Sequence, residues 1–219
     1  MQNDGSKRLS QVLRLLVFLL IVKVTVGVVL SFGGYLPPRF ESGFLNGRDS
    51  YFWSGYHLAF YAHIVSGPGS LLLGMLLLSE RFRRRFAGWH RKLGRVQVAS
   101  VLLVVSPSGL AMSFYAETGA VAGVGFGTLA VATALCVLLG WRSAVKRRFA
   151  EHRVWMLRCY VLLCSAVVLR LTAGLATVSG VEGEWAYQIS AWTSWLVPLA
   201  ILEVWRRRGR RKPVSVEVE

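Results

Sequence analysis

The sequence predicts an all-α protein of the membrane, a polytopic bundle of six membrane-spanning helices with the N- and C-termini in the cytoplasm. Three observations lead to this fold. Of the 219 residues, 54% are hydrophobic, and the mean hydropathy is +0.48. The chain contains six long apolar runs, and its basic residues gather at alternate ends of those runs. Ordinary soluble domains are less apolar and lack such uninterrupted runs.

Each apolar run is long enough to cross a bilayer, which takes about 20 apolar residues in a helix. The first run is expected to be a membrane helix and not a cleaved signal peptide, because Lys23 interrupts it and no A-x-A cleavage site follows. The connections are short, so we expect one helical domain over residues 12–205. A cytoplasmic segment, 1–11, precedes it, and a basic, disordered cytoplasmic tail, 206–219, follows. The six runs are Val12–Phe32, Tyr56–Ser79, Val96–Tyr115, Ala120–Trp141, Val154–Val178 and Tyr187–Trp205.

The distribution of the basic residues predicts the topology. The net charge is +15, and most of the 26 lysines and arginines lie in residues 7–14, 81–95, 142–158 and 206–212. These four segments fall on one side of a six-helix arrangement, which is the cytoplasmic side by the positive-inside rule. We therefore expect a multi-pass protein of the inner (plasma) membrane whose basic surface contacts anionic lipid head groups. The same distribution argues against nucleic-acid binding.

Ionisable side chains inside the predicted membrane helices indicate functional sites. Each costs about 2.5–3.5 kcal/mol on insertion scales. His63 and Arg170 each lie about 10–12 Å below the outer end of their predicted helix. The two are therefore expected to form a polar intramembrane site near the outer face. His90 and His152 are expected at the cytoplasmic face. His152 and Arg170 are 18 residues apart, so a regular helix would place them on one side, about five turns from each other.

The cationic groups in these runs have no carboxylate close by in the sequence. No Asp or Glu falls inside a run, and Glu203 lies at the inner end of the sixth. Lys23, Arg158 and Arg170 are therefore expected to be met by backbone carbonyls, water, snorkelling or a bound anion.

Three segments form a recognisable pattern: YAHIVSGPGSLLLGMLLL, WHRKLGRVQV and EHRVWMLRCYVLLCSAVVLRL. Their order and spacing resemble the bacterial family of predicted membrane proteins called domain of unknown function 2306, over residues Tyr51–Trp205. The resemblance implies a polytopic inner-membrane protein with a histidine and arginine signature and no assigned substrate. The matching residues are His63, Gly67, Gly74, His90, Arg91, Gly94, Arg95, His152, Arg153, Met156, Arg158, Leu169 and Arg170.

The first functional hypothesis is electron transfer through a bound haem b. A b-type haem needs two imidazoles from different helices, and His90 and His152 are the best pair, with Arg158 for the propionates. A second, outer haem is not expected, because His57 and His63 point about 240° apart on one helix. No metal site is expected beyond the haem iron, since no cysteine and histidine cluster has zinc spacing.

Two other hypotheses stay open. The chain would be a transporter, or a protein that binds a lipid, an anionic metabolite or another small molecule such as a quinone, with His63 and Arg170 in the site. Alternatively, it would be a non-catalytic assembly factor of the membrane, for which the closely spaced glycines 119, 123 and 127 provide a packing face. The sequence does not predict the oligomeric state, and it contains neither a G-x-S-x-G nor an H-E-x-x-H motif.

Overall fold

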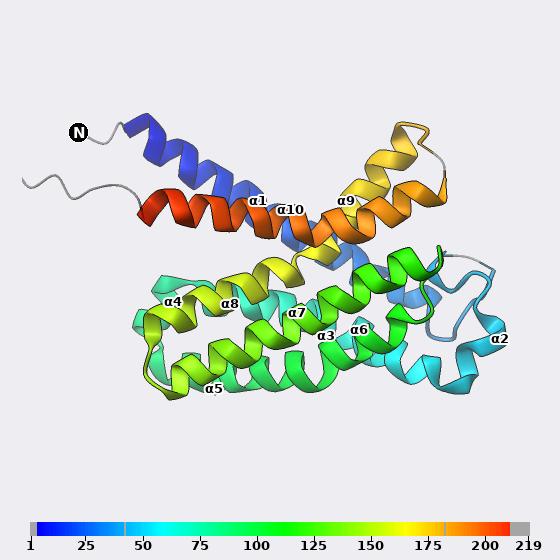
Figure 1. Cartoon of the computed structure of the whole chain (residues 1–219), viewed down its shortest axis with the longest axis horizontal. Coiled ribbons are helices and arrows are strands. Elements are labelled where there is room, and N and C mark those ends of the chain that lie inside the picture. The colour runs from blue at the N-terminus through cyan, green and yellow to red at the C-terminus, as the bar shows by residue number, and fades with distance from the viewer. Residues whose placement is uncertain (1–3, 42, 182, 211–219) are drawn as a thin grey trace, which may run out of the picture. The chain divides into compact units, whose positions relative to one another are not determined.

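The computed structural model describes residues 4–41, 43–181 and 183–210 of the chain (Figure 1). Within these residues the structure is almost entirely helical and contains no β-strand. The predicted all-α fold class is therefore confirmed. The chain divides into two compact units, Met1–Ala116 and Glu117–Glu219, which are described separately. A single domain over residues 12–205 remains a prediction.

The first unit is built on three long helical segments. They are α1 (Asp4–Leu30), α3 (His57–Leu78) and a third segment of α5 (Ala87–Ser100), η4 (Val101–Val105) and α6 (Ser106–Ser113). α3 packs along all three parts of the third segment. The shorter elements are η1 (Ser31–Gly34), η2 (Gly43–Leu45), α2 (Asp49–Tyr51), η3 (Phe52–Tyr56) and α4 (Glu80–Arg85).

Prolines affect the second and third segments differently. α3 remains one α-helix through Pro68. In the third segment, Pro107 stands in the first turn of α6, where a missing N–H costs least. The turn just before it, η4, is a π-helix. The third segment therefore departs from a regular helix where its proline predicts a kink.

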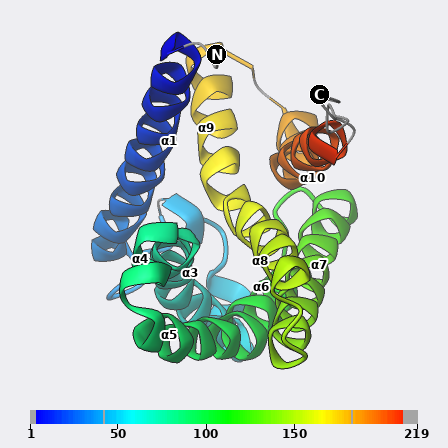
Figure 2. The same ribbon diagram turned by 90° about the vertical axis from the view of Figure 1, so that its left-hand side faces the viewer.

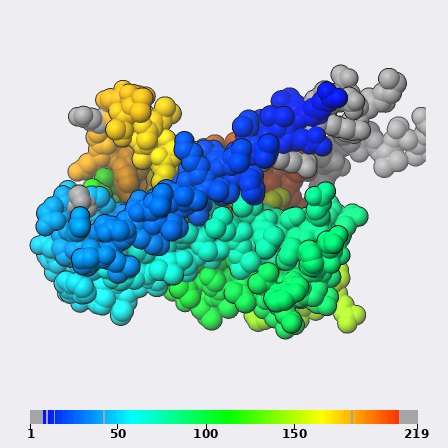
Figure 3. Space-filling model, turned by 180° about the vertical axis from the view of Figure 1, so that it is seen from behind, coloured from blue at the N-terminus to red at the C-terminus, as the bar shows by residue number. Residues whose placement is uncertain are grey.

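The helix α1 contributes little to the core of the first unit. Among its described side chains only Ile21 and Thr25 are buried, and most of its leucines and valines are exposed. Figure 3 shows this helix, in blue, open on the visible face. Such an apolar, uncovered surface is what a membrane helix presents to lipid.

The connection from α1 to α3 forms a compact aromatic cap. Its centre is the fully buried set Leu45, Phe52, Tyr56 and Phe60. Gly55, with φ +103°, supplies a conformation that other residues rarely adopt and lets the chain turn into α3. The sequence analysis treated this stretch as a simple connection. The rings packed around the centre are Tyr35, Phe40, Tyr51 and Tyr61.

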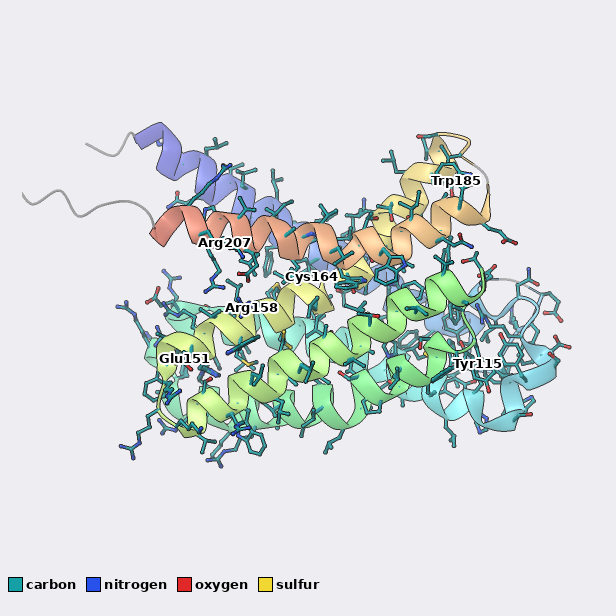
Figure 4. The ribbon with its side chains drawn as sticks, in the orientation of Figure 1. Tyr115, Glu151, Arg158, Cys164, Trp185 and Arg207 are labelled. Carbon is teal, nitrogen blue, oxygen red and sulfur yellow. The ribbon has the colours of Figure 1, made fainter. Side chains whose placement is uncertain are left out.

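Arg48 is the polar anchor of the aromatic cap. Its side chain is almost fully buried, and its Nη1 donates to Tyr51 Oη at 2.7 Å and to the Tyr115 carbonyl at 2.9 Å. Its Nε donates to the Phe44 carbonyl at 2.7 Å. The guanidinium therefore ties the cap to the end of the third segment, where Figure 4 labels Tyr115.

In the described residues of the second unit there are four helices, α7 (Ala120–Val145), α8 (Phe149–Leu163), α9 (Ser165–Val178) and α10 (Glu184–Arg210). A short turn joins α7 to α8, so the two helices lie antiparallel, side by side (Figures 1 and 2). Gly140 makes this contact close: a Cβ built there would lie 2.7 Å from Met156 Sδ. α10 is attached to α7 by Trp192, whose Nε1 donates to the Val121 carbonyl at 3.1 Å.

Five helical segments in the described part of the chain are long and apolar enough to cross a membrane. They correspond to the first five predicted runs, and α10 is not among them. α10 is 27 residues long, but it carries polar and charged side chains such as Gln188 and Glu203. The count of six spans and the cytoplasmic termini therefore remain predictions. The five segments are Gln11–Gly34, Asp49–Leu78, Ala87–Ser113, Ala120–Val145 and Phe149–Val178.

Candidate functional site

The predicted site residues fall in both units. His63 lies on α3 and His90 on α5, in the first unit, whereas His152, Arg158 and Arg170 lie on α8 and α9, in the second. Each predicted pair, His90 with His152 and His63 with Arg170, joins one unit to the other. Because the units are described separately, both pairings remain predictions.

His152 is fixed in one orientation by the neighbouring helix. Its Nδ1 lies 2.8 Å from the carbonyl oxygen of Gly140 on α7. A carbonyl only accepts, so Nδ1 carries the proton in this contact and donates it. The Nε2 atom then has its lone pair available in the neutral imidazole. Histidines that bind metals are typically held in this way, by a hydrogen bond from the other ring nitrogen to a carbonyl or carboxylate.

Arg158 is paired with a carboxylate, contrary to the expectation from the sequence. Its Nε donates to Glu203 Oε1 at 2.7 Å and its Nη2 to Oε2 at 3.1 Å. Arg206 Nη1 lies 3.2 Å from the same carboxylate, and the Arg158 guanidinium stacks 4.4 Å from the ring centre of Trp155. The prediction that Arg158 lacks a protein carboxylate was wrong, because α10 packs on α8 and brings Glu203 to it.

Arg170 lies on an exposed side of α9. Its Nη1 donates to the carbonyl of Ala166, one turn earlier in the same helix, at 2.9 Å. The regular helix assumed between His152 and Arg170 is interrupted at Cys164, which separates α8 from α9 with ψ −10°. Figure 2 shows the chain changing direction between these two helices. The 18-residue spacing therefore does not place the two side chains on one continuous face.

A row of polar side chains, here called the polar seam, lies between α3 and the third segment. His63 Nδ1 is 3.1 Å from Ser108 Oγ, and Ser70 Oγ is 2.8 Å from Ser100 Oγ. Gln97 Nε2 donates to the Ser70 carbonyl at 2.9 Å. The sequence analysis selected His63 and missed the other four. The glutamine and several serines within one apolar run could have indicated these contacts. Such groups cost free energy in lipid unless they are paired.

The described residues contain no group of three or more histidine, cysteine, aspartate or glutamate side chains suited to a metal ion. Protein ligation of a bare metal normally takes three or four side chains. A haem iron takes only two from the protein, because the macrocycle supplies the rest.

Comparison with known proteins supports the resemblance seen in the sequence. A family model described as a predicted membrane protein (DUF2306) matches residues 60–206, most of the chain and all five predicted site residues. No curated protein and no solved structure matches this chain. The family match and the apolar helices together show a multi-pass membrane protein, and they assign it no activity.

Proposed function

We propose that this chain, which belongs to the DUF2306 family of predicted membrane proteins, is an electron carrier of the inner membrane that binds haem b. The observation that carries the proposal is the 2.8 Å contact from His152 Nδ1 to the Gly140 carbonyl. It directs Nε2 of a membrane-surface histidine away from the helix that holds it, as an axial haem ligand requires. When bound, the haem would supply the one-electron chemistry.

The residues of this chain would hold and tune the group. His152 and His90 would be the two residues that hold the haem iron. Arg158 would offer a propionate its remaining N–H groups, two on Nη1 and one on Nη2, because Nε and the other Nη2 hydrogen bind Glu203. Gly140 positions His152 in two ways, since its carbonyl accepts the Nδ1 proton and its lack of a side chain lets α8 approach.

The inner-membrane location and the cytoplasmic termini belong to the same proposal. Four basic segments on one side of the spans support this topology. A green fluorescent protein fused after Glu219 should fluoresce in intact bacterial cells, because it folds in the cytoplasm. A fusion that is exported and dark while the protein is membrane-inserted would contradict this orientation.

The test of haem binding is an absorption spectrum of the detergent-purified protein from haem-sufficient cells, first oxidised and then reduced with dithionite. A Soret band with sharp reduced α and β bands is expected. Both His90→Ala and His152→Ala should lose it, whereas His57→Ala should keep it, since His57 is not one of the two proposed ligands. A colourless, folded wild-type protein would refute the proposal.

A second candidate function is the binding of an anionic lipid or metabolite. The observation that favours it is the cluster of Arg158, Glu203 and Arg206, in which two guanidinium groups share one carboxylate. One positive charge remains in excess, on side chains that are only partly exposed. Nanodiscs of phosphatidylglycerol should then raise the melting temperature more than nanodiscs of phosphatidylcholine, and Arg206→Met should remove the difference. His63 and Arg170 would form a separate polar site within the membrane in this function.

A further inference from the structure

The polar seam of the first unit is made of five side chains. They are His63 and Ser70 on α3 and Gln97, Ser100 and Ser108 on the third segment. Ser70 and Gln97 are each only 2% exposed, and Ser108 is 6% exposed. Helices in lipid associate through small residues and through hydrogen bonds between side chains such as serine, glutamine and histidine. Adhesion of this kind explains paired groups, but it does not explain a buried group that has no partner.

The seam follows the axis of the segments. His63 and Ser70 are seven residues apart on α3, so they lie on one face about 10 Å from each other. On the partner segment, Gln97 and Ser108 are separated by about 16 Å of helix. His90 lies seven residues before Gln97, on the same face of α5. From Ser108 to His90 the polar positions cover about 27 Å, close to the thickness of a hydrocarbon core.

The π-helical turn η4 aligns the two halves of the third segment. Ser100 and Ser108 are eight residues apart, which in a regular helix leaves them about 80° out of phase. A π turn takes up one extra residue, so across η4 this separation is close to two full turns. Both serines then face α3, as their contacts with Ser70 and His63 show. π turns of this kind occur frequently at functional sites.

The seam contains an acceptor that its neighbours do not satisfy. Gln97 Nε2 donates to Ser70, but Gln97 Oε1 is buried and has no hydrogen-bond partner within the described part of the chain. A buried acceptor of this kind costs free energy unless a water molecule donates to it. Ser70, whose backbone carbonyl accepts from Gln97, also pairs through its hydroxyl with Ser100, so further polar groups for a water molecule belong to the same part of the seam.

We propose that the polar seam is a route for protons through the first unit. It goes beyond the proposed electron transfer and uses no residue of the second unit. Hydroxyl groups, water and imidazole each accept a proton at one atom and release one at another. A proton enters at the His63 end or the opposite end, passes along the seam through water beside Gln97, and leaves at the other end. The chain is unchanged afterwards, and the transmembrane potential supplies the driving force.

The test is proton flux into sealed proteoliposomes. The purified protein is reconstituted in vesicles that contain the pH-sensitive dye pyranine, and valinomycin with a potassium gradient sets the potential. Wild-type vesicles should acidify severalfold faster than protein-free vesicles. Ser70→Ala and Gln97→Leu should each reduce the rate severalfold. Gln97→Glu should keep it, because a carboxyl of the same size also transfers protons.

The matched control is Ser143→Ala on α7. Ser143 is also a buried serine, but its hydroxyl bonds only the Leu139 carbonyl of its own helix. This variant should conduct like the wild type. Wild-type flux equal to that of empty vesicles would overturn the inference. So would equal flux in the wild type and in a folded Ser70→Ala variant, which would leave the seam an adhesive contact between helices. The assay needs no reduced or coloured protein, so its result is independent of haem binding.

Discussion

Replacing Glu203 by glutamine tests the charge cluster of the second unit most directly. The side chains of Arg158 and Glu203 are 23% and 28% exposed, and that of Arg206 is 15% exposed. Glutamine keeps the shape but removes the charge, so two half-buried guanidinium groups lose their counter-ion. Hydrogen bonds to charged groups contribute about 1.5–3 kcal/mol, and a broken buried pair costs about 3–5 kcal/mol. For this partly exposed cluster we expect a loss of about 2–3 kcal/mol.

That loss should lower the melting temperature by about 4–12 °C for a chain of this size. The assay is thermal denaturation in one detergent, followed by tryptophan fluorescence. Glu80→Gln is the matched control, since Glu80 also binds two arginines, Arg83 and Arg84, but with all three side chains well exposed. Its expected loss is about 0.5 kcal/mol or less. If Glu203→Gln destabilises no more than Glu80→Gln, the cluster does not hold α8 to α10 as argued.

The other predictions concern packing in both units. Gly140→Ala should destabilise by about 1–3 kcal/mol, because the new methyl would lie 2.7 Å from a thioether of α8. Gly174→Ala, with open space around it, should not. Thermal denaturation compares the two. Arg48→Met should cost about 3 kcal/mol and make the aromatic cap sensitive to protease, since two acceptors in the cap and the Tyr115 carbonyl lose their donor. Arg39→Met, at an exposed position, should leave the digestion pattern unchanged. Cys159, 1% exposed, should react with maleimide only after denaturation, and rapid labelling of the folded protein would show that α8 is not packed as described.

The helical fold was predictable because lipid allows few structures. Backbone groups in hydrocarbon must bond within the segment, so a long apolar run has to be a helix. α10 was harder to predict, since its polar residues bind the Thr118 carbonyl just before α7 and Arg158 of α8, and the same residues lower the apolar character of the helix.

The partner of Arg158 was not predictable from local sequence. Glu203 lies 45 residues further along the chain, on a helix whose packing no periodicity determines. The long arginine side chain reaches across to it, so the position of its Cα says little about what its charge meets. The same reasoning applies to Arg48, whose acceptors include a carbonyl 67 residues away.

The aromatic cap and the alignment of the seam depend on irregular backbone. Gly55 turns the chain at a positive φ, and η4 changes the phase of the third segment. Neither follows from a regular period of 3.6 residues. Dense aromatic residues around Tyr51 were visible in the sequence, but their convergence on one buried centre needed the turn at Gly55.

The π turn η4 also has a consequence for changes in chain length. Exchanging its apolar residues Val101–Val105 for one another alters packing only, and such exchanges usually cost under about 1.5 kcal/mol. Deleting one of them would restore a regular helix of nearly the same apolar length, which still inserts into a bilayer. Ser100 and Ser108 would then be seven residues apart, which is again close to two full turns, so both would still face α3. A single deletion within η4 should therefore be tolerated, whereas a single insertion there would turn α6 by about 100° relative to α5 and carry Ser108 away from His63.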